Sequence, residues 1–277
     1  MVIFSVVWCI RKTIMALKEV ANKTILLTGA TGGIGSAIAK ALSVRGAQLV
    51  LVGRNKKKLS ELNDRLGGKH LDCVADISTQ NGRDTIIGFC ENEVRQIDVV
   101  INNAGLGYFG AFESMEPSMI DQVIQTNLIS QMLLCQGFLP LLKTFKKSEV
   151  INVGSTFGSI GYPGFTAYCA SKFGLKGFSE ALGRELSDTG ISIRYFAPRA
   201  TQTKLNTEQV TEMNKALANG VDSPEHVAEA LVAFVSNSQR RTFLGWPEKL
   251  FVRLNGVFPT VVDQAITKKL DVIRQYF

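Results

Sequence analysis

The sequence predicts a single α/β domain built on a doubly wound parallel sheet with helices on both faces. Short, continuously apolar segments alternate with segments of helical spacing from residue 23 to about residue 237, and such strands are typical of a parallel sheet covered on both sides. The chain has 277 residues, of which 45% are hydrophobic, and a chain of this size can bury a sizeable core. A ligand is expected beyond the carboxyl ends of the strands, where the strand order reverses.

Three strand–helix pairs are expected in the first part of the chain. Each strand is a run of mostly apolar residues, and in the first helix apolar residues return at helical spacing. The second helix is polar and lysine-rich. In chain order the pairs are Thr24–Leu27 and Ile34–Arg45, Gln48–Val52 and Asn55–Leu66, and His70–Val74 and Thr79–Val94.

The second part continues the alternation with three more strands. The expected order is the strand Asp98–Asn102, a long helix at Met119–Phe145, the strand Glu149–Val153, a helix at Ala167–Ser187 and the strand Ser192–Ala197. The polar segment that follows, Arg199–Gly220, is predicted to be either a lid over the substrate or an ordinary surface helix.

Charge and cysteine content narrow the functional class. The net charge is +7, and residues 240–277 hold seven basic and three acidic residues, so much of the excess lies at the end of the chain. No basic run is interleaved with aromatic residues, which argues against a nucleic-acid partner. The cysteines are scattered without a CxxC pair, as in reduced cytosolic proteins. Because no histidine is spaced with a cysteine as zinc ligands are, we expect no metal site.

Three parts of the chain are distinguished. Residues 1–14 form an N-terminal extension whose apolar run of about ten residues is too short to span a bilayer. It is interpreted as dispensable or as a weak membrane-surface anchor. Residues 15–240 are the expected catalytic domain, and residues 241–277 an amphipathic C-terminal extension. We expect a cytoplasmic protein, with membrane association as the alternative.

The turn after the first strand carries the first functional signal. Glycines in such a turn let the backbone approach a pyrophosphate, and the helix that follows presents free N–H groups and its positive dipole end. The expected cofactor-binding residues of this turn are Thr28, Gly29, Thr31, Gly32, Gly33, Ile34 and Gly35.

The same turn resembles the TGxxxGxG turn of the single-domain short-chain dehydrogenases, and further motifs of that family follow in its usual order. Asn102–Gly105 reads NNAG after the fourth strand, and Asn127 lies in a TNL context within the long helix. Tyr168–Lys172 matches YxxxK, and Ser155 precedes Tyr168 by the family's usual 13 residues.

This resemblance covers Lys23 to about Thr203 and implies a Rossmann-like fold and a hydride transfer between NAD(P)(H) and a carbonyl or alcohol substrate. It also implies that Lys172 holds the nicotinamide ribose and that Asn127 supports a water in a proton relay. The residues implied as catalytic are Asn127, Ser155, Tyr168 and Lys172, and those implied to bind cofactor include Asn103, Ala104, Gly105, Tyr168 and Lys172.

Elementary chemistry supports these roles. Tyr168 and Lys172 are four residues apart on one helix and project from the same face. A cation near a phenol favours the phenolate, so we expect a lowered pKa for Tyr168 and a role as acid and base. Ser155 can donate a hydrogen bond where negative charge develops on the substrate oxygen. Retention of all these groups argues against the alternative, a non-catalytic NADP(H)-binding sensor or scaffold. A nucleotide-sugar epimerase or dehydratase, which can share YxxxK, is disfavoured by the glycine spacing.

The residues at the end of the second strand indicate which cofactor is preferred. Sites specific for NAD carry an acidic residue there, whereas this chain has Gly53 and Arg54. An arginine can pair with a 2′-phosphate, so NADP(H) is favoured and NAD(H) is the alternative. Gly32 stands where many NADP-users of the family have a basic residue, which counts against this preference. The resemblance adds Asp76, Ile77, Pro198, Thr201 and Thr203 to the cofactor site.

Two departures from the family pattern concern the substrate and the assembly. Arg199 replaces a small glycine, and it is expected either to crowd the site or present a cation to an acidic or thioester-linked substrate, or to point to solvent. Residues 241–277 replace the short strand and glycine-rich turn with which many relatives build a tetramer. This tail suits packing on the domain or a partner, or a membrane interface. We expect a homo-oligomer, and an apolar substrate because Phe157, Tyr162 and Phe165 lie near Ser155.

Overall fold

The computed structural model describes residues 20–277 and contains one seven-stranded parallel sheet. The strand order is β3-β2-β1-β4-β5-β6-β7, so the order reverses between β1 and β4. The strands are β1 Thr24–Thr28, β2 Gln48–Gly53, β3 Leu71–Val74, β4 Val99–Asn102, β5 Ser148–Val153, β6 Ile191–Ala197 and β7 Arg241–Phe243. The predicted doubly wound sheet is confirmed, and the extension at residues 1–14 lies outside the described residues.

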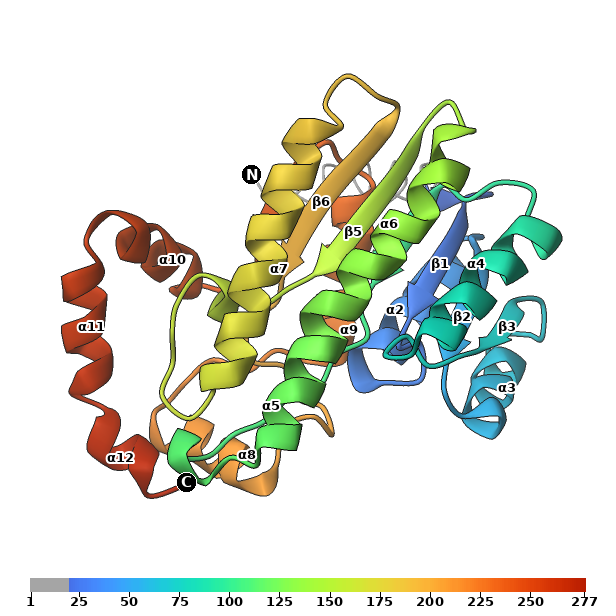
Figure 1. Cartoon of the computed structure of the whole chain (residues 1–277). Coiled ribbons are helices and arrows are strands. Elements are labelled where there is room, and N and C mark those ends of the chain that lie inside the picture. Colours follow the sequence, from blue (N-terminus) through green and yellow to red (C-terminus); the bar gives the residue numbers. More distant parts are fainter. Residues whose placement is uncertain (1–19) are drawn as a thin grey trace, which may run out of the picture.

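Helices cover both faces of the sheet (Figure 1). One face carries α2 Gly33–Val44 and α9 Pro224–Val235, and the other carries α4 Gln80–Glu93, α6 Ser130–Lys143 and α7 Thr166–Glu185. Successive β1 residues supply both cores, because Ile25 and Leu27 belong to the α2–α9 side and Leu26 to the α4–α6 side. This alternation of side chains explains why the strands are apolar throughout.

The long predicted helix is interrupted by a wider turn. It consists of α5 Pro117–Ile124, the π-helical turn η2 Gln125–Ile129 and α6. Such π turns are rare and are frequent at functional sites. Here η2 contains the buried Asn127. The predicted helix at residues 55–66 corresponds to α3 Lys56–Arg65, with Asn55 as its N-cap.

The expectation that residues 241–277 replace the family's short last strand is wrong for the first three of these residues. β7 pairs in parallel with β6, with Tyr195 opposite Arg241 and Ala197 opposite Phe243, and Gly245 follows with φ +87°. A three-residue strand that begins with arginine has too few residues to show a strand period. Its pairing with β6 is a backbone contact that the sequence pattern does not report.

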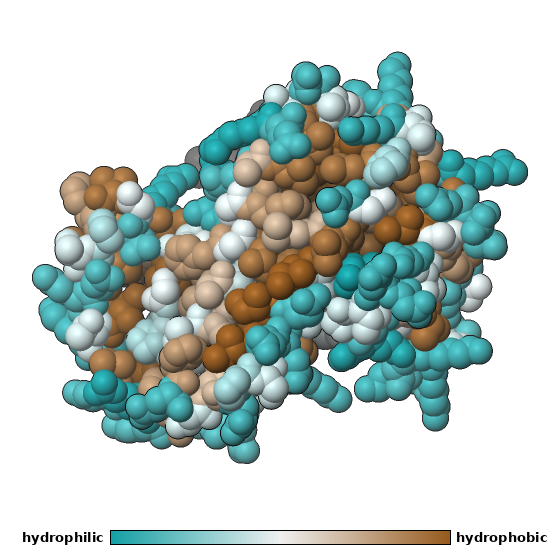
Figure 2. Space-filling model, in the orientation of Figure 1, coloured by the Kyte–Doolittle hydropathy of each residue, from teal (hydrophilic) through white to brown (hydrophobic). Residues whose placement is uncertain are grey.

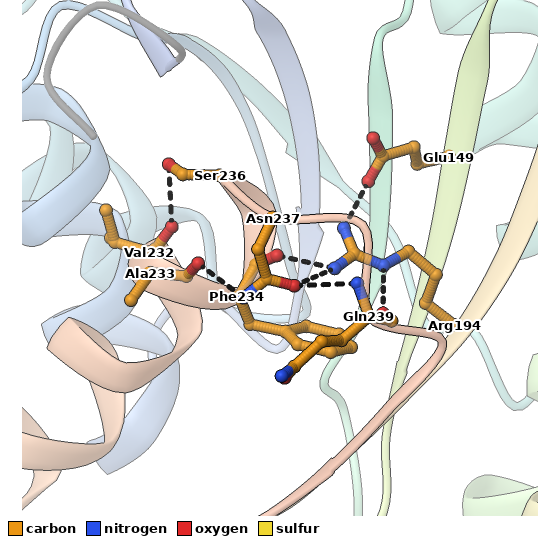
Figure 3. Close-up of polar contacts among 8 residues, drawn as sticks. All are labelled: Glu149, Arg194, Val232, Ala233, Phe234, Ser236, Asn237 and Gln239. Carbon is orange, nitrogen blue, oxygen red and sulfur yellow. Dashed lines mark hydrogen bonds and ion pairs between the residues drawn. The ribbon is translucent and has the colours of Figure 1, made fainter. Parts of the chain in front are cut away.

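A buried arginine, Arg194, links β5 and β6 to the end of α9. Arg194 of β6 forms an ion pair of 2.8 Å with Glu149 of β5, and its guanidinium also donates to the carbonyl of Phe234 and the side chain of Asn237 (Figure 3). Its Nε donates to the carbonyl of Gln239. A buried charge of this kind requires such partners, and the network holds the chain between α9 and β7 in place.

The tail after β7 forms an arm of three short helices, α10 Glu248–Val257, α11 Pro259–Thr267 and α12 Leu270–Arg274. In Figure 1, α10 and α11 project away from the sheet, and α12 lies near α8 Glu208–Ala216. Ile273 of α12 is fully buried against Val210 and Met213 of α8. Within residues 20–277, no helix is long and apolar enough to cross a membrane.

Candidate active site

A cavity of about 520 Å³ lies at the carboxyl ends of the strands. It extends on both sides of the point where the strand order reverses, which is where doubly wound sheets bind their ligands. The predicted site residues that line it are Gly29, Thr31, Gly32, Gly33, Ile34, Gly35, Arg54, Asp76, Ile77, Asn103, Ala104, Gly105, Ser155, Tyr168, Lys172, Pro198, Thr201 and Thr203. Two predicted site residues, Thr28 and Asn127, lie behind its wall.

The glycine turn between β1 and α2 leaves the start of α2 open to the cavity. Gly29 has φ +64°, and a side chain there would come within 2.8 Å of the Cα atom of Ala104. A side chain on Gly35 would strike the carbonyl oxygen of Gly29. Gly32 caps α2 without a side-chain hydrogen bond. The first N–H groups of α2 therefore remain available to an anion, as the helix dipole favours.

Thr28 supports the site from beneath. Its hydroxyl donates to the carbonyl of Ile101 and accepts from the backbone N–H groups of Asn103 and Ala104, at 2.9 and 3.1 Å. The Asn103 side chain in turn donates to the carbonyls of Thr28 and Gly29. These bonds join the ends of β1 and β4. Thr28 therefore positions the loops that line the cavity, and it does not line the cavity itself.

Basic side chains stand at the end of β2. Arg54 is largely exposed and lies 3.8 Å from the carboxylate of Asp76. Lys58, which the sequence analysis did not assign to the site, lines the same part of the cavity. Its backbone N–H is held by the Asn55 side chain in the first turn of α3. The sequence signal for this residue is the run of three lysines, Lys56–Lys58, that follows Arg54 and Asn55. Asn55 caps α3, which places Lys58 in the first turn of the helix.

A buried tyrosine, which the sequence pattern did not single out, hydrogen-bonds to the backbone of Ser155. The Tyr195 hydroxyl donates to the carbonyl of Ser155 at 3.2 Å and accepts from its N–H at 3.3 Å. A side chain on Gly154 would collide with the Tyr195 ring, and one on Gly158 with the Tyr195 hydroxyl. The Ser155 hydroxyl accepts from the N–H of Phe157 at 3.1 Å. The sequence signal for this contact with Ser155 is a single tyrosine within β6.

Tyr168 and Lys172 lie together on α7 as their spacing predicts. The Lys172 ammonium donates to the carbonyl of Val153 at 3.0 Å and lies 5.8 Å from the centroid of the Tyr168 ring. Burial raises the pKa of Tyr168 to about 12, against an opposing hydrogen bond with Ser155. Burial also lowers the pKa of Lys172 to about 8.

The expected lowering of the Tyr168 pKa is therefore wrong in direction. Desolvation disfavours both the phenolate and the ammonium ion, and here it is the largest influence on each group. A tyrosine with a raised pKa stays protonated at neutral pH, and it is then a proton donor rather than a resident base.

Asn127 lies behind the loop that follows β4. Its side chain accepts from the N–H of Leu106 at 2.7 Å and donates to the carbonyl of the same residue at 2.8 Å. It also donates to the Ser171 hydroxyl at 3.1 Å. A side chain on Gly105 would come within 3.1 Å of Asn127 Oδ1 and 3.8 Å of Lys172 Nζ. Asn127 thus joins η2, the loop after β4 and α7 near the Lys172 ammonium.

Arg199 takes neither of the polar roles expected for it. Its guanidinium pairs with Asp222 at 2.8 Å and with Glu248 of α10 at 3.2 Å, and its side chain is 19% exposed. It borders the cavity, but the two carboxylates balance its charge, so it neither points into solvent nor presents a free cation. Its ion pairs join the segment after β6 to the arm.

The other half of the cavity is mostly aromatic and aliphatic. Phe157 stacks on Tyr162 with ring centroids 5.0 Å apart, and the Phe165 centroid is 6.4 Å from that of Tyr162 and 6.2 Å from that of Tyr168. Further apolar lining comes from Phe109, Leu205, Val210 and Met213. The segment predicted as a lid or surface helix contains α8, which contributes the last two of these side chains.

Comparison with known proteins shows the family of the chain. The family profile described as short chain dehydrogenase matches residues 23–214. The chain is 34% identical to a 3-oxoacyl-(acyl-carrier-protein) reductase of Haemophilus influenzae over 195 residues, which is 70% of this chain and 80% of the relative. It is 29% identical to a ketoacyl reductase of a Nostoc species over 258 residues, 90% of this chain and 89% of the relative.

Solved structures show the same fold. A 3-ketoacyl-(acyl-carrier-protein) reductase from Brucella melitensis, complexed with NADH, superposes with a TM-score of 0.74 at 25% identity, covering 81% of this chain and 96% of the other. A short chain dehydrogenase from Burkholderia cenocepacia, in complex with NADP, has a TM-score of 0.77 at 19% identity, covering 89% and 98%.

Proposed function

Since the chain belongs to the short-chain dehydrogenase family and is an NAD(P)-dependent oxidoreductase acting on alcohol or keto groups, we propose that it reduces an apolar ketone or aldehyde with NADP(H). The observation that carries this proposal is the convergence of Ser155, Tyr168 and Lys172 on one cavity that also borders the glycine turn. The same residues would oxidise the corresponding alcohol in the reverse direction.

Each of these side chains has a distinct task. The cofactor supplies the hydride. The Tyr168 hydroxyl donates its proton to the oxygen that becomes negative, and its raised pKa keeps it protonated for this step. Ser155 donates a hydrogen bond to the same oxygen, and Tyr195 holds Ser155 in position. Lys172 holds the nicotinamide ribose, and Asn127 supports the proton relay by fixing the loop beside Lys172.

The residues around the glycine turn fit a dinucleotide. The open N-terminus of α2 suits its pyrophosphate. Arg54 and Lys58 together suit a 2′-phosphate, which a carboxylate at the same place would repel. Asp76 and Ile77 would flank the adenine. NAD(H) is the alternative cofactor. The ion pair between Arg54 and Asp76 favours it, because the carboxylate partly neutralises the charge that would attract a 2′-phosphate.

The proposed substrate is an apolar or acyl-type carbonyl compound. Aromatic and aliphatic side chains dominate the half of the cavity beyond Tyr168, and apolar surface of this kind favours hydrocarbon groups. Reductases of 3-oxoacyl thioesters are among the relatives, which supports an acyl substrate. The competing function is a non-catalytic NADP(H)-binding sensor or scaffold.

NADPH absorbance measured with purified protein separates these functions. The carbonyl panel contains acyl thioesters, long-chain aldehydes, steroids, quinones and sugars, and each compound is repeated with NADH. We expect consumption with one apolar class, faster with NADPH. Tight NADPH binding without consumption across the panel would instead support the sensor.

Two exposed apolar surfaces suggest partners. Figure 2 shows an apolar band over the region of α6 and α7. The exposed large apolar residues of η2, α6 and α7 are Ile129, Met132, Leu133 and Phe173, and we propose that a second copy of the chain covers them. Light scattering of the wild type and of Leu133→Glu tests this, because a charge at that position should dissociate the oligomer.

The arm presents a different surface. Its exposed apolar residues stand beside Lys249 and Arg253, and they are Trp246, Leu250, Phe251, Val257, Phe258 and Val261. We propose that this arm contacts the surface of an anionic membrane, since basic and large apolar side chains together suit such an interface. Sedimentation with vesicles should show binding to anionic lipid that Phe251→Ser and Phe258→Ser weaken. Equal sedimentation with zwitterionic vesicles would contradict the role of charge.

A further inference from the structure

Several polar side chains line the half of the cavity beyond Tyr168, Lys204, Asn206 and Thr207 among them, and three others form a separate group. Tyr162, Asn214 and Asn219 all line the cavity, and the Asn219 amide donates to the side-chain oxygen of Asn214 at 3.0 Å. The Phe165 ring centroid is 6.4 Å from that of Tyr162 and 6.2 Å from that of Tyr168, so one aromatic side chain neighbours both the polar group and the reacting centre. Its other neighbours in the cavity wall include Phe157, Val210 and Met213.

The end of α8 holds Asn219 in this group. The N–H of Asn219 donates to the carbonyl of Asn214 at 2.9 Å, and the N–H of Ala218 donates to that of Lys215 at 3.1 Å. This pair of bonds is a Schellman motif. It places Ala218 at φ +50°, a left-handed conformation that is unfavourable for a non-glycine residue. The strained turn directs Asn219 back along the helix toward Asn214 and the cavity.

The Tyr162 hydroxyl is buried and, among the residues that the structure describes, has no hydrogen-bond partner of acceptable geometry. Burial raises its pKa, and the nearby Asn219 side chain lowers it in part, so the phenol is neutral at neutral pH. A buried hydroxyl without a hydrogen-bond partner is unfavourable. A ligand oxygen placed beside Asn219 would supply the missing partner.

Building on the proposed reductase function, we propose that Tyr162, Asn214 and Asn219 form a polar subsite for a second hydrogen-bonding group of the substrate. The substrate is then an apolar carbonyl compound with a hydroxyl or carbonyl oxygen at a distance from the carbon that accepts the hydride. The Tyr162 hydroxyl and an asparagine amide N–H donate to that oxygen. A hydrocarbon spacer lies along Phe165 between the two polar ends.

Methyl ketones of graded chain length, each paired with its ω-hydroxy counterpart, test this subsite. In the wild type, one chain length should show a KM about tenfold lower for the hydroxy ketone than for the plain ketone. Tyr162→Phe should raise the KM for that hydroxy ketone about tenfold and leave the plain ketone unchanged. Asn219→Ala should give the same pattern, which keeps the test valid if one variant does not fold.

The control variant is Tyr276→Phe, because Tyr276 belongs to the same apolar cluster as Tyr162 but does not line the cavity. It should change neither KM. Preference for the plain ketone at every length, or equal losses for both ketones in Tyr162→Phe, would overturn the subsite. Calorimetric binding of the same ketone pairs to the protein loaded with NADP⁺, which has no hydride to donate, gives the same comparison without reduction of the ketone. Selective binding without NADPH oxidation would therefore support the subsite and contradict only the reductase function.

Discussion

Lys172 Nζ lies 5.8 Å from the centroid of the Tyr168 ring, one helical turn away on α7, and donates to the carbonyl of Val153 at 3.0 Å. The two groups are desolvated together. Burial therefore raises the pKa of the phenol and lowers that of the ammonium ion, to about 12 and about 8. At neutral pH both carry their protons, which suits the proton-donating step of a carbonyl reduction.

Replacing Tyr168 by phenylalanine should lower kcat at least about 100-fold, because positioned acid–base groups contribute about 10²–10⁴ to a rate. NADPH binding, measured by fluorescence titration, should stay within twofold of the wild type. Tyr276→Phe serves as the control for loss of a hydroxyl outside the cavity. Near-normal turnover in Tyr168→Phe would contradict the proposed acid.

Lys172→Met should change how stability depends on pH. The Lys172 pKa is about 8 in the folded chain against a reference of 10.5, so the unfolded chain binds the extra proton between these values. Stability linked to this group therefore rises as the pH increases from about 8 to 10.5. Urea unfolding should show the wild type gaining free energy of unfolding relative to Lys172→Met across this window. Parallel curves for the two proteins would show that the buried lysine is not depressed in pKa.

Arg54→Ala and Lys58→Ala should each raise the KM for NADPH about tenfold or more, because a hydrogen bond to a charged group contributes about 1.5–3 kcal/mol. The KM for NADH, which lacks the 2′-phosphate, should change little. Lys57→Ala is the matched control, since Lys57 is exposed and does not line the cavity. Equal effects on the two cofactors would contradict a phosphate site at the end of β2.

Ile273→Ala should raise the KM for an apolar carbonyl substrate several-fold while leaving NADPH binding unchanged. Ile273 is fully buried against Val210 and Met213, which belong to the cavity wall, and truncating a buried isoleucine to alanine costs about 2–5 kcal/mol. The loss should loosen α8 over the substrate half of the cavity. Val261→Ala, at an exposed position of α11, is the control. A lowered melting temperature with an unchanged KM would mean that α12 stabilises the protein without shaping the cavity.

The glycine turn and α7 show how much of the site was predictable. Gly29 to Gly35 bring the backbone to the cavity through local φ angles and close approach, and Tyr168 and Lys172 share a face because they are four residues apart. Both relationships are properties of neighbouring residues. Tyr195 was missed because its role depends on a contact with Ser155 beside the neighbouring strand. Lys58 was missed because only the folded chain shows which lysine of α3 lines the cavity.

The sequence by itself determined the order of strands and helices, the place of the cofactor turn and the pairing of Tyr168 with Lys172, since each follows from periodicity or short spacing. The tertiary structure alone decided the seventh strand, the carboxylates that balance Arg199 and the packing of Ile273 on α8. It also decided the direction of the Tyr168 pKa shift. These features depend on desolvation and on contacts between distant segments, which exist only once the chain has folded.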